Sequence, residues 1–303
     1  LQVKGGKCLE SSLQPMEQLK IKEKKKSPWI EAWRKLKKQR LAMIGLGIVL
    51  FFIIVGLLAP VITTHPYDGF NQDKTLIPPN SEHWFGTDDQ GRDIFTRVVF
   101  GARISIWIGF FSVIGSVVVG SILGLIAGYY GKWVDSIISR LFDIMLAFPS
   151  ILLAIAIVAI LGPSLFNALI AIAIINIPTY GRLIRSRVLS VKQEEYVAAA
   201  KTIGMSNGRI LFHHVLPNSI TPIIVQGTLG IATAILEAAA LGFLGLGAQP
   251  GEPEWGKMLA DSRQFITVAP WTLLFPGFAI MLVVLGFNMF GDGLRDALDP
   301  KTK

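Results

Sequence analysis

The residues best suited to chemistry gather between 196 and 218, and the first candidate among them is a serine. Gly204-Met-Ser206-Asn-Gly208 matches Gly-x-Ser-x-Gly, the turn that presents the nucleophilic serine of many hydrolases. That turn needs a strand before it and a helix after it, within a parallel sheet. Here a run of small residues typical of a helix precedes Gly204, and no sheet is indicated. We therefore expect no catalysis by Ser206.

The second candidate chemistry is metal binding by the adjacent histidines His213 and His214. Neighbouring side chains on a helix point about 100° apart, whereas zinc-binding helices place their histidines at i and i+4. The chain has four histidines, and the other two, His65 and His83, are expected on the opposite side of a membrane. We therefore predict no metal site.

The third candidate is a phosphate-binding loop at Gly251-Glu-Pro-Glu-Trp-Gly256-Lys257. Met258 follows it, at the position where Ser or Thr would bind magnesium, and no strand precedes it. The chain is therefore predicted to bind no nucleotide or other cofactor and to be no enzyme. If ATP drives its function, a partner subunit binds the ATP.

Two acidic residues next to apolar runs are candidate lining or gating residues. Glu237 lies within the apolar run 220–247. The ten Leu, Ile, Val and Phe side chains between residues 222 and 244 favour insertion by about 3 to 6 kcal/mol, and one carboxylate costs about 2.5 to 3.5 kcal/mol. Such a residue faces protein or water, so Glu237 either lines a path or forms a structural hydrogen bond between helices. Asp143 follows Arg140 by three residues, so the two can pair on one helix face.

Long apolar runs must position these residues. The chain has 303 residues, of which 51% are hydrophobic and 17% are charged. A run of 18 or more residues without charge indicates a membrane-spanning helix. Such runs lie at residues 41–64, 104–131, 144–161 and 264–291. Two further candidates are the 16-residue run 165–180, which polar residues at its ends can extend, and the run 220–247, which Glu237 interrupts. We therefore predict an all-α integral membrane protein with six transmembrane helices, the third of them kinked at Pro149.

The net charge of +8 could indicate nucleic-acid binding, but its distribution indicates a membrane instead. Residues 1–40 contain 12 of the 29 Lys and Arg residues, directly before the first span. Positive residues mark cytoplasmic segments, and alternating from a cytoplasmic N-terminus places 23 of the 29 on that side. We predict a multi-pass protein of the bacterial cell membrane with both termini cytoplasmic.

Residues 41–64 form a retained span rather than a signal peptide, because the run is long and ends near Pro60. Residues 1–15, which contain the single cysteine Cys8, precede Met16 and are treated as a tag or an upstream start. The predicted organisation is a basic cytoplasmic segment (1–40), the first transmembrane helix (41–64), an extracytoplasmic loop (65–103), a five-helix core (104–292) with a cytoplasmic loop (182–219), and a cytoplasmic tail (293–303).

Small residues recur every fourth position in the second span, at Ser116, Gly120, Gly124 and Gly128. Such a ridge lets another backbone approach closely. We favour simple helix packing over a moving interface as its role.

The sequence pattern predicts two short helices in the cytoplasmic loop. Ser190 and Gln193 form a capping-box pattern that predicts a helix from about Val191, and Gly204 would end it in a left-handed cap. Ser206 would cap a second helix, which Pro217 ends. Ala198, Ala199 and Ala200 give the first helix a thin surface that fits a groove on a partner; the alternative is a loop that lies on the lipid surface.

The spacing Ala198-Ala199-Ala200, Gly204, His214, Leu216-Pro217 resembles the cytoplasmic loop of ABC-importer permeases. Two positions depart from the family pattern: Ala198 stands where Glu is frequent and His214 where Ile is frequent. Glu195, one turn earlier, can supply the missing charge. The segments FGTDDQGRDIFTRVVFGARIS, LEAAALGFLGLGAQPGEPEWGKML and FNMFGDGLRDALDP are similar to the C-type permease of dipeptide and oligopeptide importers.

This resemblance covers residues 30–300 and implies a type I importer permease fold. It also implies a second homologous permease, two cytoplasmic ATPases that hold ATP and Mg²⁺, an extracytoplasmic solute-binding protein and a peptide substrate. The residues expected to couple to the ATPase are Glu195, Ala198, Ala199, Ala200, Gly204, His214, Leu216 and Pro217. Similar permeases also carry nickel complexes and some sugars, so the sequence does not identify the cargo.

The main alternative is an ion-coupled secondary transporter or channel that works without an ATPase. Such a protein is expected to carry internal repeats and ion-coupling charges in its spans. Asp143 and Glu237 are the only candidate ion-coupling charges in the spans, and no internal repeat is evident.

Overall fold

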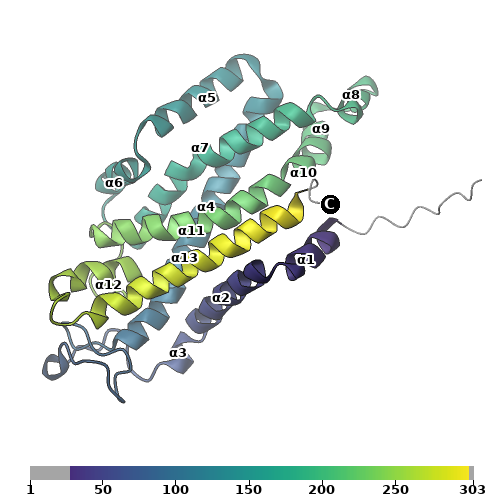
Figure 1. Cartoon of the computed structure of the whole chain (residues 1–303). Coiled ribbons are helices and arrows are strands. Elements are labelled where there is room, and N and C mark those ends of the chain that lie inside the picture. Colours follow the sequence, from purple (N-terminus) through teal and green to yellow (C-terminus); the bar gives the residue numbers. More distant parts are fainter. Residues whose placement is uncertain (1–27, 300–303) are drawn as a thin grey trace, which may run out of the picture.

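The computed structural model of the chain describes residues 28–299, and this part is helical, with one isolated bridge between Thr87 and Asp93. The long helices are α2 (Arg40–Leu57), α4 (Ile94–Tyr130), α5 (Lys132–Ala147), α7 (Leu165–Val191), α11 (Thr221–Phe243) and α13 (Trp271–Leu298). The shorter ones are α1 (Pro28–Lys38), α3 (Ala59–Ile62), η1 (Gln72–Lys74), α6 (Ser150–Leu161), α8 (Glu195–Thr202), α9 (Asn207–Ile210), η2 (Leu211–Val215), α10 (Leu216–Ser219), α12 (Trp255–Ser262) and η3 (Arg263–Phe265). The long helices lie side by side in one bundle (Figure 1).

Five of the described helices are apolar and long enough to cross a membrane: α2, α4, α7, α11 and α13. Asp93 caps α4, because its carboxylate accepts a hydrogen bond from the Thr96 amide at 2.7 Å. Residues 94–103 therefore belong to the same continuous helix as the apolar run that begins at residue 104.

Helices α4 and α7 run parallel, and the ridge of small residues lies between them. The Ser116 hydroxyl donates to the Ala173 carbonyl at 2.8 Å. One turn further on, a Cβ added at Gly120 would lie 2.6 Å from the carbonyl oxygen of Ile177, and one at Gly124 would lie 2.2 Å from that of Gly181. The ridge therefore packs helix against helix, as predicted, because only small residues allow this approach.

Helices α5 and α6 are the broken element of the bundle. They are bent by 95° around Pro149, a sharper change of direction than the predicted kink. Pro149 has no amide hydrogen to continue the helix. The twelve residues of α6 extend only about 18 Å and cannot cross a bilayer alone. However, α4 and α7 are parallel, so the connecting pair must return the chain from one end of the bundle to the other. We therefore count α5 and α6 together as the third of six crossings.

The first and last spans form an antiparallel pair, α2 with α13. A Cβ added at Gly45 would meet the carbonyl oxygen of Gly286 at 2.7 Å, and one added at Gly293 would meet the Cβ of Ala42 at 2.2 Å. Leu36 of α1 and Ala297 of α13 are buried in the same small cluster. Both ends of the described chain therefore lie at the same end of the bundle (Figure 1).

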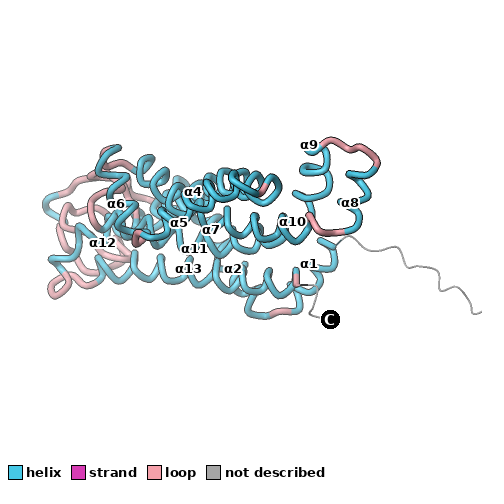
Figure 2. Tube along the Cα trace, turned by 90° about the horizontal axis from the view of Figure 1, so that it is seen from above, coloured by secondary structure: helices cyan, strands magenta, loops and turns pink. Residues whose placement is uncertain are grey.

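The two ends of the bundle differ in character. Helices α8, α9 and α10 gather at the end that also holds α1 and the last turn of α13 (Figure 2). The loop before α4 and helix α12 gather at the opposite end. There Trp255 is fully buried and donates from Nε1 to the Val98 carbonyl at 3.0 Å, which ties α12 to α4.

Candidate coupling site

The coupling module, as we name residues 192–220, differs at its start from the prediction. Helix α7 continues to Val191, and α8 begins at Glu195 with Glu194 as its N-cap. The capping-box prediction was therefore wrong. The Ser190 hydroxyl donates to the Ser186 carbonyl at 3.3 Å within α7 and caps nothing. The packing of Val188 against Gly128 of α4 extends α7 past this local pattern.

Gly204 ends α8 as predicted, with a φ of +78°. The Gly204 amide donates to the Lys201 carbonyl at 3.0 Å, and the Met205 amide donates to the Ala200 carbonyl at 3.1 Å. These two bonds form a Schellman motif, which satisfies the last carbonyls of a helix and places a left-handed residue after it. A residue without a Cβ is needed to turn the chain here.

The second half of the module is one continuous helical rod that contains a π-turn. Ser206 precedes α9 as its N-cap, although its side chain makes no capping hydrogen bond. Pro217 does not end the rod, contrary to the prediction, because the wider π-turn from Leu211 to Val215 comes directly before it. The Asn218 side chain then donates to the His214 carbonyl at 2.7 Å. The rod ends only at Ile220, and Pro222 stands in the first turn of α11.

One face of the module is buried against the spans. Val197, Ile210 and Val215 are fully buried in one apolar cluster with residues of three spans. The span residues in this cluster are Leu125 and Tyr129 of α4, Ile184 and Val188 of α7, and Ile223 of α11. A force applied to the module would therefore act on three spans at once.

Polar contacts strengthen the same connection around Tyr129. The Tyr129 hydroxyl bonds the Asn207 side chain at 2.7 Å, and the Lys192 ammonium donates to the Tyr129 carbonyl at 2.6 Å. The ammonium groups of Lys192 and Lys201 also lie 5.6 and 5.9 Å from the centre of the Tyr129 ring. The last turn of α4 is thus held by the start of the module and by residues of α8 and α9.

The opposite face of the module is exposed. Ala198 and Ala199 are exposed, whereas Ala200 is buried in the module's own core. Two large apolar side chains of the module are also exposed: Ile203 is 77% exposed and Phe212 is 62% exposed.

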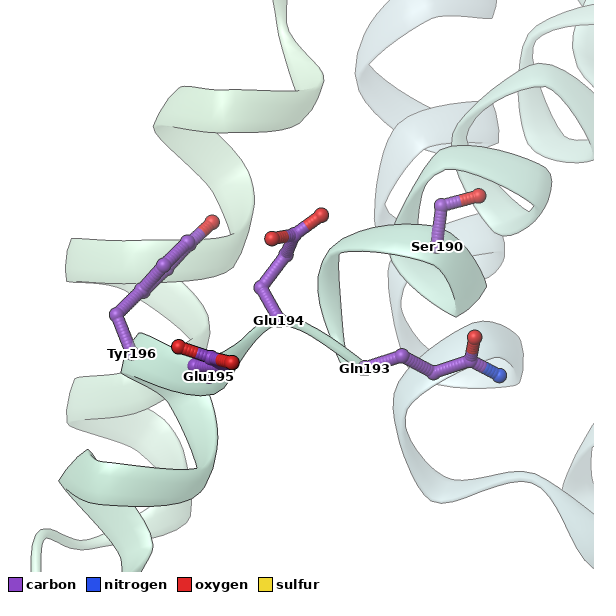
Figure 3. A pocket seen from close by; sticks show the side chains of 5 residues that line it. All are labelled: Ser190, Gln193, Glu194, Glu195 and Tyr196. Carbon is purple, nitrogen blue, oxygen red and sulfur yellow. The ribbon is translucent and has the colours of Figure 1, made fainter.

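A shallow open hollow separates the end of α7 from the start of α8 (Figure 3). Ser190, Gln193, Glu194, Glu195 and Tyr196 line it. Glu195 is exposed at its rim, in the first turn of α8, where a carboxylate interacts favourably with the helix dipole. The hollow holds no group that suggests catalysis.

The remaining predicted coupling residues lie on the rod. Pro217 is exposed, whereas His214 and Leu216 are half-buried. The His214 ring lies 6.1 Å from that of Tyr196, so it fills space between the rod and α8. Seven of the eight predicted residues retain some exposed surface on this module, and Ala200 supports it from inside.

The two candidate lining residues lie in separate places. The Asn176 side chain of α7 donates to Glu237 of α11 at 2.8 Å. Two roles were expected for Glu237, and this contact is the second of them, a structural hydrogen bond between helices. Asp143 pairs with Arg182 of α7 at 2.5 Å, so the predicted pair with Arg140 is wrong. Sequence spacing favoured the local partner, but α5 turns Asp143 toward α7.

Comparison with known proteins agrees with this architecture. Residues 120–303 match the family described as "Binding-protein-dependent transport system inner membrane component", and residues 27–79 match "N-terminal TM domain of oligopeptide transport permease C". The fold is similar to that of the MetNI methionine ABC transporter in an inward-facing conformation, with a TM-score of 0.54, 18% identity, and coverage of 68% of this chain and 98% of that one.

Curated relatives cover nearly the whole chain. The Dipeptide transport system permease protein DppC of Alkalihalophilus pseudofirmus is 69% identical over 277 residues, which is 91% of each chain. DppC of Haemophilus influenzae is 48% identical over 92% of this chain and 96% of its own. The Glutathione transport system permease protein GsiD of Pectobacterium atrosepticum is 46% identical over 92% and 93%.

The protein is therefore an all-helical, multi-pass inner-membrane permease of the ABC-importer class. The chain belongs to the family of binding-protein-dependent transport system inner membrane components, within the group that carries the oligopeptide permease C N-terminal domain.

Proposed function

We propose that the chain is the permease subunit of an ATP-driven importer of dipeptides or short oligopeptides. The 69% identity to a dipeptide permease over 91% of the chain carries this proposal. The relatives named for glutathione, itself a short peptide, favour the same cargo class.

The partners follow from the family. A second homologous permease would complete the path, two cytoplasmic ATPases would hold ATP and Mg²⁺, and an extracytoplasmic binding protein would deliver the cargo. The chain itself would bind neither nucleotide nor metal for this task. Because it belongs to a permease family, it would contribute motion rather than hydrolysis.

The coupling module would receive the ATPase stroke. The exposed Ala198 and Ala199 would enter a groove on the ATPase, with Ile203 and Phe212 covering its apolar rim. Closure of the ATPase pair would pull the module sideways. The cluster around Val197, buried against α4, α7 and α11, would pass this displacement to three spans and open the path outward.

Glu195 would supply the charge that Ala198 lacks. It is exposed one turn before Ala198 on α8. Copurification of the ATPases with Glu195→Ala should therefore fall relative to wild type, and Glu195→Ala combined with Ala198→Glu should recover it. Glu252→Ala, which removes a carboxylate at the opposite end of the bundle, serves as the control. Equal recovery of ATPase from all variants would reject this role.

Reconstituted transport tests the function as a whole. The complete complex in proteoliposomes should take up a labelled dipeptide only with ATP inside and binding protein outside. A proton ionophore should leave uptake unchanged. Uptake that needs no ATP and disappears with the ionophore would instead establish ion-coupled transport.

A further inference from the structure

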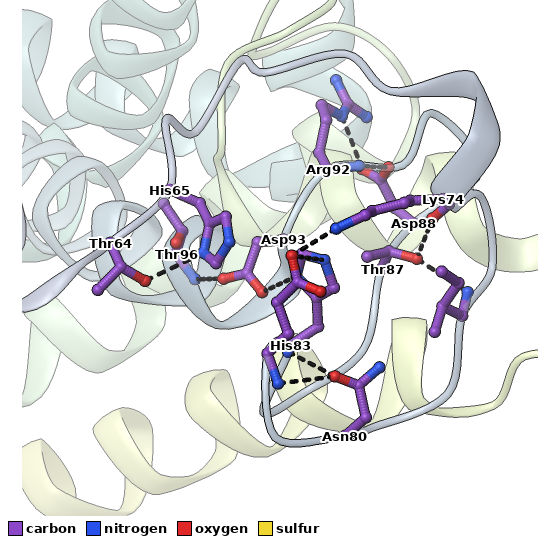
Figure 4. Close-up of polar contacts among 12 residues, drawn as sticks. Thr64, His65, Lys74, Asn80, His83, Thr87, Asp88, Arg92, Asp93 and Thr96 are labelled. Atoms are coloured by element: carbon purple, nitrogen blue, oxygen red, sulfur yellow. Dashed lines mark hydrogen bonds and ion pairs between the residues drawn. The ribbon is translucent and has the colours of Figure 1, made fainter.

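A histidine-rich cluster lies at the end of the bundle opposite the coupling module. His65 follows α3, and Glu82 and His83 lie in the loop before α4 (Figure 4). One ligand atom from each of these three residues lies within 4.8 Å of the others. The rings of His65 and His83 are 4.8 Å apart, centre to centre. The sequence did not indicate this cluster, because His65 and His83 are 18 positions apart and fit no metal motif.

His83 is oriented like a metal ligand. Its Nδ1 bonds the Asp93 carboxylate at 3.0 Å, and both side chains are only 4% exposed. Its Nε2 is buried and has no hydrogen-bond partner. A metal-ligating histidine characteristically gives its other ring nitrogen to a carboxylate, which fixes the ring and leaves the free nitrogen for the ion. A buried ring nitrogen without a partner is otherwise costly.

The surrounding loop holds this arrangement in place. The Asn80 side chain accepts hydrogen bonds from the amides of both Glu82 and His83 at 2.8 Å, so the backbone of these two residues is fixed. Asp93 is itself fixed, because it caps α4. On the other side, the Thr64 hydroxyl contacts Nδ1 of His65 at 3.1 Å, which leaves Nε2 of His65 free.

Glu82 completes the set of donors. Its Oε1 lies 3.9 Å from Nε2 of His83 and is ion-paired with Lys74. Its side chain is 56% exposed and can turn toward the histidines. Ligands at about 2.0 to 2.2 Å from a tetrahedral ion are about 3.4 Å apart. The three ligand atoms here lie within 4.8 Å of one another, so rotations of the Glu82 and His65 side chains would close the site around His83.

We propose that His65, Glu82 and His83 form a binding site for a divalent transition-metal ion of the zinc type, with Asp93 orienting His83. Two imidazoles and one carboxylate suit zinc, with water in the fourth position, and do not suit Mg²⁺ or Ca²⁺, which prefer oxygen ligands. The ion would tie the segment after α3 to the loop before α4, and so clamp the connection between the first two spans. This proposal does not depend on the cargo or on the ATPase partners.

Zinc binding to the purified full-length chain tests the proposal. The protein would carry Cys8→Ser and a tag without histidine, and calorimetry after chelator treatment would follow Zn²⁺ and, separately, Mg²⁺. We expect one Zn²⁺ per chain and no Mg²⁺ at the site. His65→Asn and Glu82→Gln should each weaken Zn²⁺ binding at least tenfold. Asp93→Asn, which can still cap α4, should weaken it about 10- to 100-fold.

The chain offers a matched control. His213→Asn with His214→Asn removes the two remaining histidines, at the other end of the bundle, and should leave Zn²⁺ binding unchanged. Thermal unfolding separates binding from misfolding. Without metal, His65→Asn should unfold at the temperature of the parent, and Zn²⁺ should raise that temperature only in the parent. Binding that survives His65→Asn and Glu82→Gln, or that is lost with the His213 and His214 changes, would overturn the site.

Discussion

Gly204 forms the turn between α8 and the second half of the coupling module. Its φ of +78° is costly for any residue with a Cβ, by about 1 to 2 kcal/mol. Gly204→Val should therefore distort the turn after α8 and abolish ATP-driven uptake, while membrane insertion stays normal. Gly208→Val is the matched control, because Gly208 lies in a right-handed helix with open space around it. Normal uptake by Gly204→Val would argue against a docking role for this turn.

Glu254 is a buried carboxylate whose protonation should affect stability. It caps α12 by accepting hydrogen bonds from the amides of Gly256 and Lys257, both at 2.8 Å, and it is 1% exposed. Burial raises the pKa of Glu254 to about 7. Because the pKa is higher in the folded protein, the folded state holds the proton more tightly. This stabilisation is complete below about pH 4.5 and is lost as the pH rises through 7.

The expected loss between pH 5 and pH 8 is about 2.5 kcal/mol, because the pKa of Glu254 rises from its ordinary 4.5 to about 7 on folding and each tenfold change in proton affinity is worth about 1.4 kcal/mol. Thermal unfolding in detergent at a series of pH values measures it. The unfolding temperature of the wild type should fall over this range, whereas that of Glu254→Gln, which cannot ionise, should change much less. Parallel curves for the two proteins would show that Glu254 does not titrate in this range.

At the scale of the element, the contact between α4 and α7 depends on the absence of side chains. A Cβ at Gly124 would lie 2.2 Å from the Gly181 carbonyl oxygen, so Gly124→Ala must push the helices apart. Overpacking of this kind costs about 1 to 3 kcal/mol. Gly47→Ala on α2 has open space around its Cβ and should be neutral or slightly stabilising. The unfolding temperatures of the two variants check this. Equal values would mean that α4 and α7 can move apart without loss of stability, which would contradict the prediction.

The elements also show how far the sequence could predict the structure. Apolar run length located the spans, and the spacing of Gly120 and Gly124 predicted a close packing face, because both are local properties of a helix. The end of α7 was missed because its packing on α4 overrides the Ser190 capping pattern. The partner of Asp143 was missed because Arg182 lies 39 residues away. Contacts of this kind depend on the path of the chain, which a sequence pattern does not contain.

At the scale of the whole molecule, the orientation of the chain in the membrane decides which side the coupling module faces and which side the proposed site of His65, Glu82 and His83 faces. The six crossings put both described ends of the chain on the same side as the coupling module, and the loop with His65 and His83 on the other. The distribution of Lys and Arg predicts that the module faces the cytoplasm. Only in this orientation could the coupling module bind a cytoplasmic ATPase while the loop before α4 faces the side from which a cargo is delivered.

Single cysteines can test this direction, since Cys8 is the chain's only cysteine and can be replaced by Ser. Ser81, in the loop before α4, and Ser206, between α8 and α9, are both exposed, and these two segments lie at opposite ends of the bundle (Figure 1). A membrane-impermeant maleimide should label Ser81→Cys in spheroplasts and Ser206→Cys only in inverted vesicles. Labelling after detergent treatment controls for reactivity. The reverse pattern would place the module outside and exclude ATPase coupling, and labelling of both cysteines from one side would contradict the six crossings themselves.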